Sequence, residues 1–134
     1  MFDVTLIEVA KRVVEANRDG PEATRTMVKA LYSSDVVSVE AVAMGSDGGE
    51  ATGSGREAQG LDAILGKHDW FDSAFEMHDS TASDPFFHGD DRFAVIYELD
   101  ATNRQTGARE PMKEVAIYTV RDGKVVREEF YYSS

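Results

Sequence analysis

The first third of the chain carries apolar side chains at the period of an α-helix. They recur every three or four residues between positions 2 and 16 and again between positions 23 and 31, so each segment has one apolar face. Asp19-Gly20-Pro21 separates the two segments, because glycine suits the end of a helix and proline suits the first turn of the next. A third helix is predicted from Leu61 to Ser73, and its apolar face consists of Leu61, Ile64, Leu65, His68 and Phe71.

The last third of the chain alternates between apolar and polar residues at the period of a β-strand. The alternation runs over Phe93–Thr102, Met112–Val120 and Lys124–Tyr132, which indicates three half-buried strands. Asp122-Gly123 is a strong signal for a two-residue hairpin turn, and positions 103–107 fit a longer hairpin loop. These three strands should therefore form an antiparallel meander.

Three shorter segments complete the prediction. Val36–Val42 is rich in β-branched residues and indicates a strand, whereas positions 75–84 indicate a less regular strand that Phe86-Phe87 extends. The glycine-rich stretch from Gly45 to Gly55 is typical of a surface loop. Helices followed by a meander predict one α+β domain over residues 1–134, in which three helices in the N-terminal half pack on a curved, mostly antiparallel sheet.

The hairpin loops predict which strand residues share a face. We expect Arg121 to stand opposite Lys124 and Arg104 to stand opposite Ala108. Alternation along each strand then gives one face with more large apolar groups, which we expect the helices to cover. The members of this inward face would be Phe93, Val95, Tyr97, Leu99, Val115, Ile117, Thr119, Val126, Glu128, Phe130 and Tyr132.

Two consequences of this register concern carboxyl groups. Glu128 would point inward unless the end of the strand twists it into solvent. Desolvation raises the pKa of an inward carboxyl group that has no partner. Glu98 would stand opposite Glu114, an unfavourable pair of like charges. A cation such as Arg127, a shared proton or a different register would resolve that pair. The outward face mixes charge with apolar bulk, which suits either a dimer interface or a solvated surface.

Composition and charge exclude several functions. The 134 residues include no cysteine, so disulfides, thiolate metal sites and a cysteine nucleophile are excluded. A net charge of −11 repels nucleic acids and anionic membrane surfaces, and neither is an expected partner. The chain shows neither a membrane span nor a signal-peptide pattern, so we expect a cytoplasmic protein.

The order of elements and three sequence stretches resemble a known superfamily. The stretches are Leu31 to Glu40, Gly60-Leu61-Asp62-Ala63-Ile64, and Val120-Arg121-Asp122-Gly123-Lys124-Val125-Val126-Arg127. With these, nearly the whole chain resembles the nuclear transport factor two-like (cystatin-like α+β) superfamily, and in particular its SnoaL-like branch. The resemblance implies a cone that encloses an apolar pocket for a hydrophobic small molecule, and a homodimer formed through the face of the sheet.

The superfamily's catalytic positions can be compared with this chain one at a time. The general base of ketosteroid isomerases falls on Glu40, so a carboxylate is retained there. The two donors of their oxyanion hole fall on about Val13 and on Val115, which cannot donate hydrogen bonds. The water-activating Asp of limonene epoxide hydrolases falls on Phe130. The resemblance thus disfavours both activities and leaves polyketide-cyclase-like chemistry open.

Histidines and aromatic side chains supply further candidates. His68 lies on the apolar face of the predicted third helix and His78 on the irregular strand, and each could transfer protons near neutral pH. Each could equally be a structural histidine that bonds a neighbouring group or turns outward. A set of mostly aromatic side chains would either line a ligand cavity or form plain core: Tyr32, Trp70, Tyr97, Val115, Glu128, Phe130 and Tyr132.

The sequence predicts neither a metal site nor a cofactor site. His78-Asp79 and residues 88–91 contain ligand-type side chains without the spacing of a zinc or calcium site. Two functions remain open. In the first, Glu40 removes a proton from a bound hydrophobic molecule and His68 or His78 returns it. In the second, the same fold binds a small molecule or a partner without catalysis. A cavity where Glu40 and a histidine converge would favour catalysis.

Overall fold

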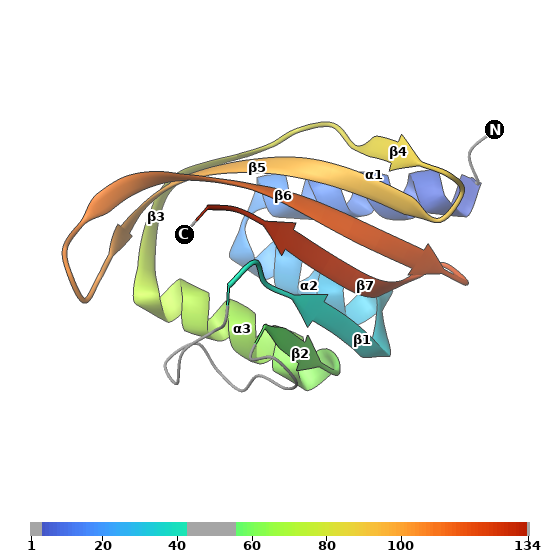
Figure 1. Ribbon diagram of the computed structural model, residues 1–134, viewed down its shortest axis with the longest axis horizontal. Helices are drawn as coiled ribbons and strands as arrows, with labels where there is room; N and C mark the ends of the chain where they lie inside the picture. Colours follow the sequence, from blue (N-terminus) through green and yellow to red (C-terminus); the bar gives the residue numbers. More distant parts are fainter. Residues whose placement is uncertain (1–3, 43–55, 134) are drawn as a thin grey trace.

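The computed structural model describes residues 4–42 and 56–133 (Figure 1). The glycine-rich stretch from Gly45 to Gly55 lies outside the described residues. The helices are α1 (Val4–Asp19), α2 (Pro21–Leu31) and α3 (Leu61–Ala74). The strands are β1 (Tyr32–Val39), β2 (Glu57–Gln59), β3 (Phe75–Ala82), β4 (Phe86–His88), β5 (Arg92–Asn103), β6 (Arg109–Arg121) and β7 (Lys124–Tyr131).

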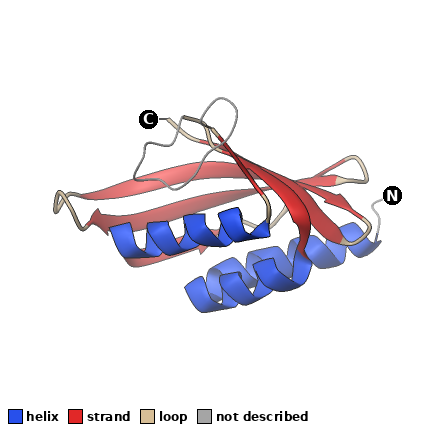
Figure 2. Ribbon diagram, turned by 90° about the horizontal axis from the view of Figure 1, so that it is seen from below, coloured by secondary structure: helices blue, strands red, loops and turns tan. Residues whose placement is uncertain are grey.

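The strands form one curved sheet with the order β2-β1-β7-β6-β5-β3, and β4 pairs with β5. Strands β1 and β7 run parallel, and the other pairs are antiparallel. Figure 2 shows all three helices on one side of this sheet. The predicted α+β class, with three helices on one face of a curved, mostly antiparallel sheet, is confirmed.

The junction between α1 and α2 follows from Gly20 and Pro21. Gly20 has a φ of 125°, a conformation that side chains disfavour, and Pro21 occupies the first turn of α2. Thr24 then ties the two helices together, because its hydroxyl group donates to the carbonyl oxygens of both Ala16 and Gly20. The two helices leave this tight corner packed against each other.

The hydrophobic core lies between the helices and the inward face of the sheet. The helices contribute mainly aliphatic side chains, and the sheet contributes both aliphatic and aromatic ones. Phe93 and Tyr118 stack there with ring centroids 4.9 Å apart. The fully buried apolar side chains include Leu6, Val13, Val28, Val36, Ile64, Phe93, Val95 and Val125.

The predicted register of β5 against β6 is wrong by one residue. Asn103 rather than Arg104 closes the loop, because its amide donates to Ala108 O and its side chain accepts from the amides of Gln105 and Thr106. Because the loop is one residue longer than predicted, every β6 side chain lies on the opposite face of the sheet from the one expected.

The corrected register changes which β6 side chains face the helices. Glu114 stands opposite Tyr97 and points inward, whereas Val115 stands opposite Ile96 on the outer face. Glu98 faces Lys113 instead of Glu114, and their charged groups lie 3.7 Å apart. The predicted pair of like charges does not form.

The hairpin between β6 and β7 forms as predicted. Arg121 pairs with Lys124, and both Asp122 and Gly123 have positive φ values, 53° and 76°. A bulge between Thr119 and Val120 then shifts the register, so Val125 rather than Val126 is fully buried. Beyond the bulge Glu128 points inward, as expected, and is 2% exposed.

Candidate functional site

Glu40 directly follows β1 and is held by side chains from distant parts of the chain. Lys67 Nζ, on α3, donates to Glu40 Oε2 over 2.5 Å, and Tyr132 OH donates to Glu40 Oε1 over 2.9 Å. The backbone is fixed as well, because the Glu40 amide donates to Arg56 O. The Lys67 and Glu40 side chains are each 15% exposed, so solvent screens this ion pair less than a surface pair.

A second carboxyl group, Glu128 on β7, is buried beside the first. Tyr32 OH donates to Glu128 Oε2 over 2.8 Å, and the Ser38 hydroxyl group also hydrogen-bonds to Glu128. Ser38 Oγ accepts a hydrogen bond of 2.7 Å from Lys67 Nζ. Burial raises the pKa of Glu128, and Lys67, Tyr32 and Ser38 oppose that rise. Lys67 is thereby connected to two carboxyl groups, directly to Glu40 and through Ser38 to Glu128.

Glu114 on β6 supplies the third carboxyl group, opposite Tyr97 on β5. Burial, followed by the negative charges of Glu40 and Glu128, raises the pKa of Glu114 to about 7. The positive charge of Lys67 opposes this rise. A carboxyl group that titrates near neutral pH can both give and take a proton under physiological conditions.

Aromatic side chains surround these charged groups. Tyr97 OH and Tyr118 OH share a hydrogen bond of 2.7 Å, and burial raises the pKa of both phenols, so they are neutral. The ring of Phe130 lies beneath Lys67 Nζ, 5.3 Å from ring centroid to nitrogen. We call the following residues the inner polar cluster: Tyr32, Ser38, Glu40, Lys67, Tyr97, Glu114, Tyr118, Glu128 and Tyr132.

The inner polar cluster contains many of the predicted site residues. Glu40, Tyr32, Tyr97, Glu128 and Tyr132 belong to it, and the Phe130 ring contacts its lysine. The hydroxyl groups of these tyrosines bond to other members of the cluster. Among the described residues, every fully buried side-chain nitrogen or oxygen has a partner.

Four predicted site residues lie elsewhere. His68 interacts with charged groups of α2 and α3, and its burial lowers its pKa, so it is neutral at pH 7. His78 lies on the exposed strand β3, and its Nε2 is 2.7 Å from Thr102 Oγ1 on β5. Trp70 is 38% exposed, and Val115 lies on the outer face of the sheet because of the shifted register.

The sequence reasoning missed four members of the cluster. Lys67 lies one helical turn after Ile64, on the inward side of α3, but lysine is usually solvated. Ser38 stands between Val36 and Glu40, where the alternation itself indicates an inward side chain. The register error hid Glu114 and Tyr118, since the predicted inward face of this strand held its odd-numbered residues instead. The polar residues at inward strand positions were therefore a usable signal, whereas Lys67 had only its helical spacing.

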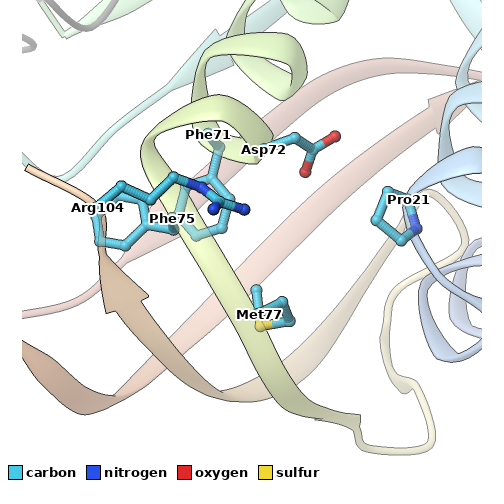
Figure 3. Close-up of a pocket in the computed structure, with 6 residues that line it drawn as sticks. All are labelled: Pro21, Phe71, Asp72, Phe75, Met77 and Arg104. Carbon is cyan, nitrogen blue, oxygen red and sulfur yellow. The ribbon is translucent and has the colours of Figure 1, made fainter. Parts of the chain in front are cut away.

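Two hollows lie away from the inner polar cluster. The first, of about 250 Å³, is drawn in Figure 3 and lies between the start of α2, the end of α3, β3 and the β5–β6 loop. Phe71 and Phe75 stack within it at 4.7 Å. Its lining residues are Pro21, Phe71, Asp72, Phe75, Met77 and Arg104. The second, of about 450 Å³, follows β3, β5 and β6 and includes Asp79, Glu98, Asp100 and Lys113.

The described residues contain no group of three or more side chains arranged to hold a metal ion. Among the described helices, none is long and apolar enough to cross a membrane. The inner polar cluster itself presents carboxyl, ammonium and hydroxyl groups.

Comparison with known proteins assigns this chain to a family. A model described as the SnoaL-like domain matches residues 4–132. A SnoaL-like polyketide cyclase structure from Mesorhizobium loti is 30% identical, with a TM-score of 0.79, and the match covers 93% of this chain and 97% of that chain. An NTF2-like protein of unknown function from Burkholderia pseudomallei is 16% identical, with a TM-score of 0.73 and coverage of 98% and 92%. No curated protein matches this chain.

The fold and these likenesses define an NTF2-like protein. More specifically, the chain belongs to the family of SnoaL-like domains. The likeness extends to TerC co-crystallised with polyporic acid, which is 21% identical, with a TM-score of 0.67 and coverage of 96% of this chain and 92% of that chain. At such identity the TerC structure supports the fold alone.

Proposed function

We propose that this protein binds a small, mainly apolar molecule beside the inner polar cluster and moves a proton on it without a cofactor. The reaction would be of the isomerase, cyclase or dehydratase type, in which a proton leaves carbon and another reaches oxygen or carbon. Glu40 would take the proton. The opposing candidate function is a non-catalytic module of the same fold.

One observation carries the proposal: three carboxyl groups from β6, β7 and the end of β1 gather around a single lysine. Ionised carboxylates that share a desolvated site repel each other, so such a group retains protons near neutral pH. Glu114 agrees with this expectation, because burial, followed by the charges of Glu40 and Glu128, raises its pKa to about 7. A plain structural core gains nothing from three such groups, whereas a proton-transfer site needs an acceptor and a donor close together.

Glu40 can act as the acceptor although both of its oxygens are already hydrogen-bonded. Each carboxylate oxygen has two lone-pair positions, so the bonds from Lys67 and Tyr132 leave one position on each oxygen. Those two bonds also fix the carboxylate's orientation, which favours proton transfer along one direction. His68 and His78 lie outside the cluster, and the proposal therefore gives the proton-transfer role to carboxyl groups.

Structural neighbours carry small molecules. TerC was crystallised with polyporic acid, and a protein with a ketosteroid isomerase-like fold from Catenulispora acidiphila contains trimethylamine. The M. loti neighbour is described as a SnoaL-like polyketide cyclase. These observations support a ligand site of small-molecule size in the present chain.

The test uses 2-tetralone, a bicyclic ketone with acidic C–H groups next to the carbonyl. In deuterated buffer, Glu40 would remove such a proton, the oxygen would be protonated, and the reverse steps would place deuterium on carbon. Mass spectrometry would follow this exchange. We expect wild-type protein to exceed the buffer rate, and Glu40→Gln to lose about tenfold or more of the increase.

Glu129→Gln is the matched control. Glu129 lies on β7 next to Glu128 but faces outward, opposite Ile117, so its loss should leave the exchange rate unchanged. Calorimetric binding of 2-tetralone without accelerated exchange would support the non-catalytic module, and the absence of both would overturn the proposed function. The module has one observation in its favour, since every tyrosine hydroxyl group in the cluster is already bonded to a protein group.

We also propose that the protein is a homodimer formed through the outer face of the sheet. The helices lie on the other side (Figure 2). The corrected register places Ile96, Val115 and Ile117 on this outer face, beside Tyr131, which is 52% exposed. Apolar side chains on an uncovered face favour association.

A further inference from the structure

The charges of the inner polar cluster are unbalanced. Glu40 at the end of β1, Glu114 on β6 and Glu128 on β7 face one ammonium group, that of Lys67 on α3. The phenols that face them from β5 and β6, Tyr97 and Tyr118, are neutral and bond to each other. With three acids and one base, the arrangement favours keeping at least one proton on a carboxyl group.

The hydrogen-bond donors are distributed unequally among the three acids. Glu40 accepts from Lys67 and Tyr132, and Glu128 accepts from Tyr32 and Ser38. Donated hydrogen bonds stabilise the ionised form of a carboxyl group. All four donors thus act on Glu40 and Glu128, and Lys67 takes part in both sets because Ser38 accepts from it.

Resting on the proposed function, we propose that Lys67 is the positioning residue of this site: it keeps Glu40 and, through Ser38, Glu128 as carboxylates, so that Glu114 carries the proton that is given to the ligand. Glu40 then takes a proton from ligand carbon while Glu114 gives one to ligand oxygen, and the cluster's total charge is unchanged. Reversal of the two transfers restores the starting state. Burial and the two neighbouring charges hold Glu114 protonated up to near pH 7, which agrees with this assignment.

Other basic side chains near these strands do not duplicate Lys67. Arg127 lies on the outer face, with its Nε 3.4 Å from Glu129 Oε1. Arg56 Nε donates to the backbone oxygen of Glu40, not to its carboxylate. Lys113 pairs with Glu98 at the surface. Lys67 is therefore the basic group whose loss should change the protonation of the cluster.

The test is a carbon-13 NMR titration of the glutamate side-chain carboxyl groups in the ligand-free protein, with signals assigned through Glu114→Gln and Glu128→Gln. In wild type, one signal should titrate near pH 7 and vanish in Glu114→Gln. In Lys67→Met, the midpoints of both Glu114 and Glu128 should rise by about one pH unit or more, since each loses its stabilising cation. Lys67→Arg should restore the wild-type midpoints.

Two further variants keep the result specific. Lys113→Met removes an exposed lysine of the same charge and should move neither midpoint. Ser38→Ala cuts only the link from Lys67 to Glu128, so it should raise the midpoint of Glu128 more than that of Glu114. Unchanged midpoints in Lys67→Met overturn the inference, and so does an unchanged Glu128 midpoint in Ser38→Ala if Lys67→Met fails to fold.

The 2-tetralone exchange assay separates this inference from the proposed function. In wild type the exchange rate should fall above about pH 7, as Glu114 loses its proton, and in Lys67→Met that fall should move to higher pH. If 2-tetralone neither binds nor exchanges while the midpoints move as expected, Lys67 still sets the cluster's protonation and the proposed function fails. If exchange occurs but its pH profile is the same in Lys67→Met, the inference fails and the proposed function stands.

Discussion

At the scale of single residues, inward polar side chains on strands carry most of the information about the site. Glu128 could be selected from the sequence because a carboxyl group at an inward strand position needs a partner, and Glu40 could be selected because the resemblance places the general base of ketosteroid isomerases there. Lys67 could not, because lysine commonly keeps its charged end in water while its stem covers apolar surface. Its role depends on Ser38 and Glu40 lying opposite α3, and this is a tertiary arrangement that no local pattern encodes.

The raised pKa of Glu114 predicts a specific dependence of stability on pH. The folded value, about 7, lies above the ordinary value of 4.5, so between these values the folded protein binds more protons than the unfolded chain. The contribution is therefore complete below about pH 4.5 and is lost as pH rises through 7. The free energy of unfolding measured in urea should fall by about 2.5 kcal/mol more in wild type than in Glu114→Gln between about pH 5 and pH 8.

The comparison with Glu114→Gln isolates this one group from the other carboxyl groups of the chain. At about pH 8 the glutamine variant should be the more stable protein, because it has no buried charge at this position. Parallel stability curves for the two proteins would show that Glu114 titrates normally and that the cluster does not desolvate it.

At the scale of elements, the helices and most strands were predictable, whereas the short strand β2 and the register of β5 against β6 were not. The Asp122-Gly123 turn determined that Arg121 pairs with Lys124, because only a few turn types connect two strands through a two-residue loop. The loop over positions 103–108 allowed two closures one residue apart, and Asn103 selects one of them through its side-chain hydrogen bonds. That single residue decided that Glu114 faces the site and Val115 does not.

The two residues of the β6–β7 turn should differ in how much stability a substitution removes. Gly123 has a φ of 76°, and a Cβ atom there would lie 3.4 Å from Thr5 Cγ2, so Gly123→Ala should cost about 1–3 kcal/mol. Asp122 has a φ of 53°, which glycine adopts freely, so Asp122→Gly should cost far less. Thermal unfolding measures both. Equal losses would mean that backbone conformation does not explain the turn's sequence.

At the scale of the whole molecule, element order alone was enough to predict the class and the layered arrangement. Helices followed by a meander allow few packings, and the one observed covers one face of the sheet with all three helices. The site depends on finer detail, since six of the predicted site residues meet at the cluster while His68, His78, Trp70 and Val115 do not.

The proposed dimer follows from the uncovered face of the sheet. Light scattering coupled to size-exclusion chromatography should give a dimer at about 10 μM wild-type protein, and Ile117→Lys should give a monomer because it replaces an apolar side chain of the outer face with a charged one. Ile7→Lys is the control, since Ile7 is an exposed apolar residue of α1 on the helical side. A wild-type monomer, or a dimer lost equally in both variants, would contradict an interface at the sheet.

The central claim is that the inner polar cluster is where the ligand's reacting group binds. A crystal structure of the protein with 2-tetralone tests it most directly. The account predicts the ketone oxygen within hydrogen-bond distance of Glu114 and an adjacent methylene group facing Glu40. A ketone bound instead in the hollow of Phe71 and Phe75, with the Glu40–Lys67 ion pair untouched, would contradict the account.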